Sequence, residues 1–264
     1  MKKIILTLCS YFFISTLSAE EVVISLVIDD VGNNYRNGLQ VVNLPGEVTL
    51  AFLPQTPYST ELAELAHKNG KQVMLHLPME SEQPKSLGPS ALTLGMTEQE
   101  YKSTVHMAID SIPHVMGLNN HMGSLVTSDR ESMVWLMDVI RDKQLFFIDS
   151  RTTEKTVAQE TALKMGVPTF KRDIFLDNSQ DEEDILSQFN LLISLAKRNG
   201  YATGIGHPYS ATINVLEKQI PLLKEKGIKL VFASEILNEH IDKRRLKWQE
   251  SSSLSPKVVK NSKL

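Results

Sequence analysis

Short apolar runs alternate with amphipathic stretches along most of the chain. Apolar residues at helical spacing predict helices, for example over 60–70, 128–143 and 181–200. The last of these begins with acidic residues, ends with basic ones and is followed by Gly200, as the helix dipole and a left-handed cap favour. Runs rich in β-branched and aromatic residues predict strands over 22–28, 48–53, 71–77, 115–120, 144–149, 167–172, 201–206 and 228–233.

This alternation of predicted strands and helices favours an α/β barrel. A helix followed by Gly and then a strand recurs along the chain, which is typical of parallel strands in βαβ units. Eight candidate strands within about 215 residues fit a closed or nearly closed β/α barrel better than an open doubly wound sheet. No G-x-G-x-x-G motif follows the first strand, which argues against dinucleotide binding. The Pro-, Gly- and Ser-rich residues 80–96 predict a rim loop over the barrel mouth.

The two ends of the chain depart from this pattern. Residues 1–19 have two early lysines, an apolar run and small residues before Glu20, which is typical of a secretory signal peptide cleaved after Ala19; an uncleaved anchor is the alternative. We therefore expect a periplasmic or secreted bacterial protein with no stable transmembrane span after cleavage. The barrel is expected over residues 20–240. The tail, 241–264, is basic and aperiodic and is expected to be disordered.

Charge and cysteine content limit the ligands and the catalytic groups that the chain can use. The net charge of −3 at pH 7 gives no global field that would attract nucleic acid. Cys9, the single cysteine, lies inside the predicted signal peptide. The mature chain therefore has no disulfide, no thiol nucleophile and no cysteine-ligated zinc, and histidines and carboxylates are left to carry any chemistry.

Polar residues gather at the ends of the predicted strands, where the active site of a β/α barrel forms. Each has an ordinary explanation, since Asp commonly caps a helix and His commonly bonds within a loop. Arg151 and Arg172 could orient the aspartates or form strand-end salt bridges. Six such coincidences at one edge nevertheless favour a shared polar site. In chain order they are Asp29–Asp30, His76 with Glu80, Asn119–Asn120–His121, Asp149–Ser150–Arg151, Arg172–Asp173 with Asp177, and His207 with Tyr209.

These residue types suit a divalent metal. Imidazole and carboxylate groups bind Zn²⁺ and similar ions, and a catalytic site needs about three of them plus an open water position. A cation would also offset the repulsion between Asp29 and Asp30, with one aspartate as ligand and the other ionised beside it. Consecutive strand residues point to opposite faces, so we expect Gly32 to let the backbone bend and bring both carboxylates to the barrel mouth.

Seven segments, in order, resemble the divergent polysaccharide deacetylases, an exported bacterial branch of the polysaccharide deacetylase superfamily. The resemblance covers roughly residues 22–237. It implies a distorted (β/α) barrel of seven or eight strands that removes N-acetyl groups from a polysaccharide with a divalent metal, for which we expect zinc. The segments are IDDVG (28–32), LAFLP (50–54), MLHLPME (74–80), NNHMGS (119–124), FIDSRT (147–152), RDIFLDN (172–178) and GIGHPY (204–209).

The resemblance also implies roles for the residues that could surround a metal. By position, Asp29 matches the general base, and Asp30 and His76 match two metal ligands. The third ligand is either His121 or Glu80, because Glu80 stands where better-studied members have a second histidine. We favour His121, since a second imidazole restores an Asp-His-His set.

The rest of the implied machinery lies at the later strand ends. His207 matches the general acid that protonates the leaving amine, and either Asp149 or Asp173 is expected to orient its ring. Substrate-binding or supporting roles are expected for Glu80, Asn120, Arg151, Arg172 and Tyr209.

We therefore expect a hydrolase that acts on the amide bonds of a cell-envelope or extracellular polysaccharide. Because the ligand pattern is altered, a second hypothesis stays open. The chain could be a weakly active or inactive glycan-binding or cell-wall scaffolding protein on the same barrel. A metal-dependent glycosidase or phosphoesterase is disfavoured. A glycosidase needs two carboxylates across a sugar, and the sequence singles out no such pair.

Overall fold

The computed structural model describes residues 21–237. The predicted signal peptide, 1–19, and the predicted tail, 241–264, lie outside the described residues, so both stay predictions. Within the described part, no helix combines the length and the apolar character needed to cross a membrane.

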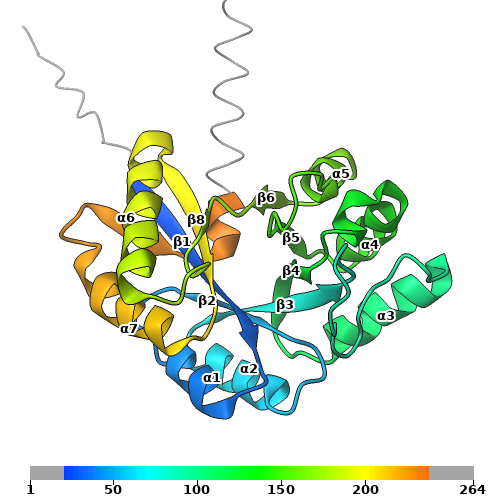
Figure 1. Ribbon diagram of the computed structural model, residues 1–264, viewed down its shortest axis with the longest axis horizontal. Coiled ribbons are helices and arrows are strands. Elements are labelled where there is room, and N and C mark those ends of the chain that lie inside the picture. The colour runs from blue at the N-terminus through cyan, green and yellow to red at the C-terminus, as the bar shows by residue number, and fades with distance from the viewer. Residues whose placement is uncertain (1–20, 238–264) are drawn as a thin grey trace, which may run out of the picture.

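One parallel sheet forms the centre of the described chain and curls into a half-barrel (Figure 1). Its hydrogen-bonded order is β6-β5-β4-β3-β2-β1-β8-β7, and β9 pairs with β1. The strands thus follow chain order around a ring that stays open between β6 and β7. The α/β barrel prediction is confirmed in this open form. The strands are β1 Val22–Val31, β2 Thr49–Phe52, β3 Gln72–Met79, β4 Val115–Met122, β5 Phe146–Asp149, β6 Thr169–Lys171, β7 Ile174–Phe175, β8 Tyr201–Gly206 and β9 Ile228–Val231.

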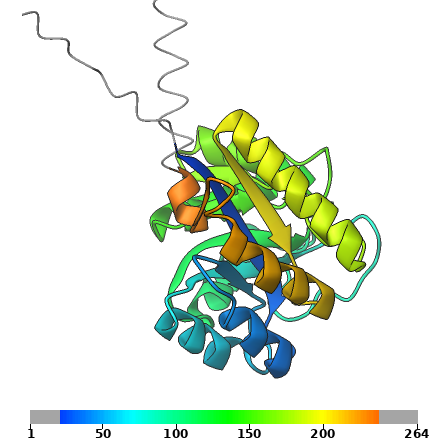
Figure 2. The same cartoon turned by 90° about the vertical axis from the view of Figure 1, so that its left-hand side faces the viewer.

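Helices cover the convex face of the sheet (Figures 1 and 2). α6 shows how local sequence sets their ends: Asp181 caps its first turn by accepting hydrogen bonds from Glu183 N and Asp184 N. Gly200 ends it with φ 85°, as predicted. The helices are α1 Tyr35–Val42, α2 Ser59–Lys68, α3 Glu98–Asp110, α4 Arg130–Asp142, α5 Ala158–Lys164, α6 Glu182–Asn199 and α7 Ser210–Gln219, with 3-10 turns at Val126–Ser128 and Ile220–Leu222.

Strand β1 lies at the centre of this arrangement. β8 pairs along it from Val23 to Ile28. On its other side, β9 pairs with its first half and β2 with its second half. The carboxyl end of β1 is therefore held from both sides at the middle of the rim.

The alternation of side chains separates two apolar layers. On β1, Ile28 belongs to the larger cluster that packs the sheet against the helices, whereas Val27 belongs to a smaller cluster inside the curl. Side chains that continue the inner rows beyond the last apolar residue reach the barrel mouth. The inner cluster comprises Val23, Val27, Ala51, Met74, Phe146, Ile148, Phe170, Ile205, Val231, Ala233 and Ile236.

Candidate active site

The polar side chains of the site continue the inner apolar rows of the sheet. Asp29 follows Val27 by two residues, His76 follows Met74, and His207 follows Ile205. Because strand residues two apart point to the same face, each of these three polar groups lies above an apolar floor. The floor keeps water away from one side of the site.

Asp30 would point away from the mouth if β1 continued as a regular strand. The register of β1 with β2 instead shifts between Ile28 and Val31, and Asp30 has a left-handed φ of 57°. Gly32 follows with φ 128°. The bend that we expected at Gly32 therefore begins two residues earlier, at Asp30 itself, and both carboxylates face the site.

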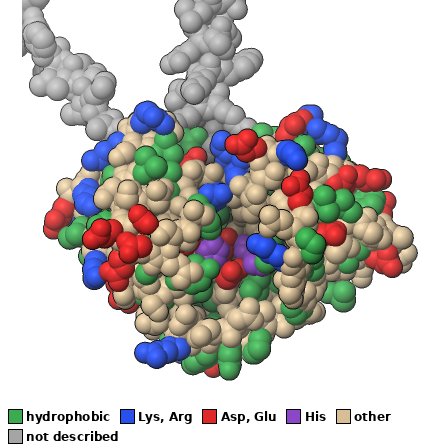
Figure 3. Space-filling view, in the orientation of Figure 1, with side chains coloured by type: hydrophobic (Ala, Val, Ile, Leu, Met, Phe, Trp, Pro, Cys, Tyr) green, Lys and Arg blue, Asp and Glu red, His purple; other side chains and the backbone are tan. Residues whose placement is uncertain are grey.

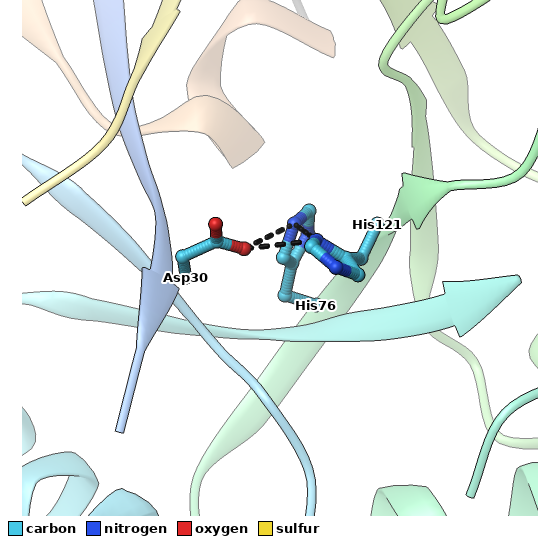
Figure 4. A group of neighbouring side chains, drawn as sticks. All are labelled: Asp30, His76 and His121. Carbon is cyan, nitrogen blue, oxygen red and sulfur yellow. Dashed lines mark hydrogen bonds and ion pairs between the residues drawn. The ribbon is translucent and has the colours of Figure 1, made fainter. Parts of the chain in front are cut away.

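Asp30, His76 and His121 converge from β1, β3 and β4 (Figure 4). Asp30 Oδ1 lies 2.9 Å from His121 Nδ1 and 3.2 Å from His76 Nε2. His121 Nδ1 lies 3.1 Å from His76 Nε2. The three donor atoms form a nearly equilateral triangle.

Asn119 connects His76 to Asp29. Its Nδ2 donates to both oxygens of Asp29, at 2.8 and 3.0 Å, so its Oδ1 is the atom that faces His76 Nδ1 at 2.8 Å. An amide oxygen only accepts, so His76 Nδ1 carries a proton, and the neutral ring presents the lone pair of Nε2 to the triangle. Metal-binding histidines are commonly held in this way, by a group that accepts the proton of the nitrogen not bound to the metal.

The triangle fits a divalent cation. Asp30 Oδ1 is buried, and its close polar neighbours are the two imidazole nitrogens of the triangle. One proton on His121 Nδ1 could satisfy only one contact, whereas a cation satisfies all three donors. Tetrahedral zinc with ligands at about 2.0–2.1 Å needs donor separations of about 3.3 Å, a few tenths of an ångström longer than those of the triangle.

Charge in the triangle is concentrated on Asp30. Burial alone would raise the pKa of this carboxyl, but the close His121 and His76 rings outweigh burial and hold the pKa well below its usual range. Asp30 therefore stays ionised, as a metal ligand must be.

Glu80 does not join the triangle. Its Oε2 accepts a hydrogen bond from Leu94 N in the rim loop, at 3.0 Å. The group of donors close enough to share an ion in the described chain consists of Asp30, His76 and His121. The choice of His121 over Glu80 agrees with this geometry.

Asp29 occupies a different environment from its neighbour. It is almost fully buried, and its Oδ2 lies 3.7 Å from His76 Nδ1. Burial raises its pKa, against the lowering effect of the nearby histidines and of the Asn119 amide. A raised pKa makes this carboxylate a stronger proton acceptor than an exposed aspartate.

His207 is held by Asp177, not by Asp149 or Asp173 as we expected. His207 Nδ1 lies 2.9 Å from Asp177 Oδ1, while Thr212 Oγ1 donates to Asp177 Oδ2 at 2.8 Å. The other ring nitrogen, Nε2, lies 3.8 Å from Asp30 Oδ2. Burial lowers the pKa of His207, but the hydrogen bond and charge of Asp177 dominate and raise it to about 9.

The two expected partners of His207 hold backbone elsewhere. Asp149 follows Phe147 of the outer layer and accepts from Arg151 N at 2.9 Å and from Thr156 Oγ1 at 3.0 Å, which fixes the loop after β5. Asp173 accepts from Thr203 N at 2.9 Å, where the ring is open. Both are occupied with structural hydrogen bonds.

A cavity of 690 Å³ opens beside the triangle. Figure 3 shows histidine side chains in a hollow of this face, with acidic and basic side chains beside them. Of the expected supporting residues, Tyr209 stacks on the His207 ring at 5.4 Å between centroids. Asn120 accepts from Ser150 N at 2.9 Å and so fixes the end of β5. Arg151 and Arg172 also line this cavity.

Asn119 and Asp177 have roles in the site that the sequence did not predict. Strand alternation contained the signal for Asn119, because it shares the parity of His121, whereas Asn120 points the other way. Asp177 follows β7, a strand of two residues that no periodicity reveals.

Comparison with known proteins places the chain among uncharacterized relatives. A family model described as divergent polysaccharide deacetylase matches residues 26–237. Uncharacterized protein YibQ of Escherichia coli (strain K12) is 40% identical over 216 residues, which are 82% of this chain and 67% of YibQ.

Solved structures share the fold. An uncharacterized protein from Agrobacterium tumefaciens C58 superposes with a TM-score of 0.80 at 22% identity, over 83% of this chain and 90% of that one. A CE4 family pseudoenzyme from Bacillus anthracis superposes with a TM-score of 0.51 at 13% identity, over 82% of this chain and 66% of that one. A mutant of the pseudoenzyme has restored enzymatic activity. The same fold thus occurs in active and inactive forms.

Proposed function

Because the chain belongs to the divergent polysaccharide deacetylase family, we propose that it hydrolyses N-acetyl groups of a cell-envelope or extracellular polysaccharide. The observation that carries this proposal is the approach of two further groups to the Asp30–His76–His121 triangle. One is a buried carboxylate, Asp29, and the other is an imidazole with a raised pKa, His207. A site that only bound a glycan would need neither. Export to the periplasm or beyond, by the signal-like residues 1–19, is part of the proposal.

Asp30 Oδ1, His76 Nε2 and His121 Nδ1 would hold the metal, for which we propose zinc. When bound, a divalent ion polarises the amide carbonyl and lowers the pKa of a water molecule to about 7. Asn119 keeps the ligand nitrogen of His76 unprotonated by fixing the proton on Nδ1.

Asp29 accepts the proton of the attacking water. Its burial and raised pKa favour proton uptake, and the two Asn119 hydrogen bonds hold its oxygens in place while it acts.

His207 donates a proton to the departing nitrogen. With a pKa of about 9, it is an imidazolium at neutral pH and carries that proton before the reaction starts. Asp177 holds Nδ1, so Nε2, on the side of Asp30, is the nitrogen that donates.

Acetate release and metal content test this function together. Purified wild type should bind about one metal ion per chain and release acetate from N-acetylglucosamine oligomers. Asp29→Asn should keep the metal but lose at least about a hundredfold in kcat, since general acid–base groups contribute roughly 10²–10⁴. His121→Ala should lose the metal, and the matched variant Glu80→Ala should keep it.

The fold neighbour that is a pseudoenzyme defines the second candidate, a glycan-binding scaffold. Wild type that holds metal, binds glycans and frees no acetate from several of them would establish the scaffold and end the hydrolase proposal. Loss of metal from Glu80→Ala but not from His121→Ala would overturn the ligand assignment.

A further inference from the structure

We propose that the glycan carries a carboxylate close to the reacting sugar, and that Arg151, Arg172 and Ser150 bind this carboxylate. This proposal rests on the proposed function, which identifies the substrate as a glycan. It adds that the glycan is acidic and that its carboxylate binds at the ends of β5 and β6.

Arg172 is a partly buried cation with free donors. Its Nε donates to Ser150 O at 2.7 Å and its Nη2 to Arg151 O at 3.1 Å, and the guanidinium lies 4.9 Å from the centre of the Phe175 ring. A guanidinium has five N–H donors, so these two bonds fix its plane and leave others for a ligand. Arg172 also lines the cavity beside the triangle.

Arg151 lies next to Arg172 in the same cavity. Its backbone has a left-handed φ of 54°, and Asp149 holds its N–H at 2.9 Å. Burial lowers the pKa of Arg172 and the charge of Arg151 lowers it further, while the charges of Asp29, Asp149 and Asp173 act in the opposite direction. Two like charges held together by a fixed backbone favour binding of an anion between or beside them.

Asp29, Asp149 and Asp173 act on Arg172 only from beyond ion-pair distance. No ion pair within 4.0 Å joins Arg151 or Arg172 to an acidic side chain among residues 21–237, contrary to the strand-end salt bridges that the sequence allowed. Glu82, which also lines the cavity, pairs with Lys155 at 3.1 Å. The guanidinium groups therefore have N–H donors that no carboxylate of the described chain occupies, and these can bind the carboxylate of a ligand.

Ser150 supplies an independent sign of a ligand. The residue is 5% exposed, it lines the cavity, and its Oγ is buried with no hydrogen-bond partner in the described chain. An unpaired buried hydroxyl costs free energy unless something accepts its proton. A carboxylate would accept from this hydroxyl and from the flat guanidinium forks, which match its two oxygens.

The cavity has room for such a ligand together with the reacting sugar. Its volume of 690 Å³ falls within the range of about 300–1,000 Å³ that is usual for ligand sites. Both the triangle histidines and the two arginines line it. One glycan can therefore present an N-acetyl group to the triangle and a carboxylate to the arginines.

Binding and acetate release are measured separately with three tetrasaccharides. Two are acidic, one alternating N-acetylglucosamine with glucuronic acid and one alternating N-acetylglucosamine with N-acetylmuramic acid. The third is the neutral N-acetylglucosamine tetramer. The proteins are wild type, Arg151→Gln, Ser150→Ala and a charge-matched control, Lys197→Gln, which changes an exposed residue on α6.

Wild type should bind at least one acidic tetrasaccharide about tenfold more tightly than the neutral tetramer, as expected for a charge-assisted pair. Arg151→Gln should remove this preference without weakening the neutral tetramer, Ser150→Ala should reduce it, and Lys197→Gln should keep it. Which of the two acidic glycans binds more tightly shows whether the subsite prefers the carboxylate of a uronic acid or that of a lactyl ether.

Equal binding of all three glycans by wild type would overturn the carboxylate subsite, and so would equal weakening of acidic and neutral glycans in Arg151→Gln. The proposed function fails on a different readout, the absence of acetate from every glycan. An acidic preference that Arg151→Gln abolishes would support the subsite even then.

Discussion

Asp29 and Asp30 are neighbours in the chain with opposite tasks. The buried Asp29 binds Asn119 and has a raised pKa, whereas Asp30 faces two imidazoles and has a lowered one. A single left-handed residue in the backbone brings both to the same place. The proposed function assigns these two identical side chains different roles, Asp29 as proton acceptor and Asp30 as metal ligand.

His207 depends on Asp177 for its protonation state. With a pKa of about 9, His207 carries its proton below that pH and loses it above, so wild-type kcat/KM should fall on the alkaline side near pH 9. Asp177→Asn removes the charge that raises this pKa, so the alkaline fall should move to lower pH by about one unit or more. A profile of kcat/KM against pH measures the shift.

Asp173→Asn is the matched control for this profile. Asp173 bonds the backbone of Thr203 and not His207, so its substitution should leave the alkaline fall in place. An unchanged profile in Asp177→Asn would show that another group sets the alkaline side.

At the scale of elements, strand periodicity accounts for much of what the sequence predicts. Residues at the ends of β1, β3, β4 and β8 are recognisable because polar groups interrupt apolar alternation there. Asp149, by contrast, carries the parity of the outer layer, and that parity explains why it holds a loop and does not reach His207.

The parts of the site that the sequence did not predict depend on features too short or too irregular to leave a periodic pattern. The partner of His207 follows a strand of two residues, and the orientation of Asp30 follows from one left-handed residue. Neither leaves a repeating pattern. The opening between β6 and β7 likewise results from the three-dimensional path of Arg172 and Asp173, which bond to β5 and β8 respectively.

Gly32 should be essential for the bend at the end of β1. Its φ is 128°, and a Cβ there would lie 2.2 Å from Thr56 Oγ1. Gly32→Ala should therefore lower the free energy of unfolding by about 1–3 kcal/mol or more. Urea denaturation measures this change.

Gly95→Ala is the control for Gly32→Ala. A Cβ at Gly95 meets nothing within 4 Å, so its substitution should change the free energy of unfolding by less than about 0.5 kcal/mol. Equal stability of the two variants would show that the bend tolerates a side chain.

At the scale of the molecule, the site joins groups from the middle and from both ends of the sheet. β1, β3 and β4 supply the triangle, Arg151 and Arg172 follow β5 and β6 towards one end, and His207 follows β8 towards the other. The inner apolar layer lies beneath all of these strands and connects them. A ligand of the triangle should therefore stabilise the whole fold.

Metal should raise the thermal unfolding midpoint, and a chelator should reverse the rise. A ligand that binds only the folded state adds about 2.7 kcal/mol at a hundred times its Kd. Differential scanning calorimetry with and without zinc measures the shift. His121→Ala should abolish it and Glu80→Ala should retain it; an identical midpoint with and without zinc in wild type would contradict a metal site in the triangle.

The position of β1 in the sheet determines how late in synthesis the sheet can be completed. β1 is the first strand of the sheet to be synthesised, yet Val22 pairs with Ile228 and Val23 with Tyr201. Pairings across so many residues form slowly, because a long loop must close first. A growing chain therefore lacks β8 and β9, which pair with β1, and also His207 until nearly the whole sheet has been made, so the site is completed among the last events of its biosynthesis.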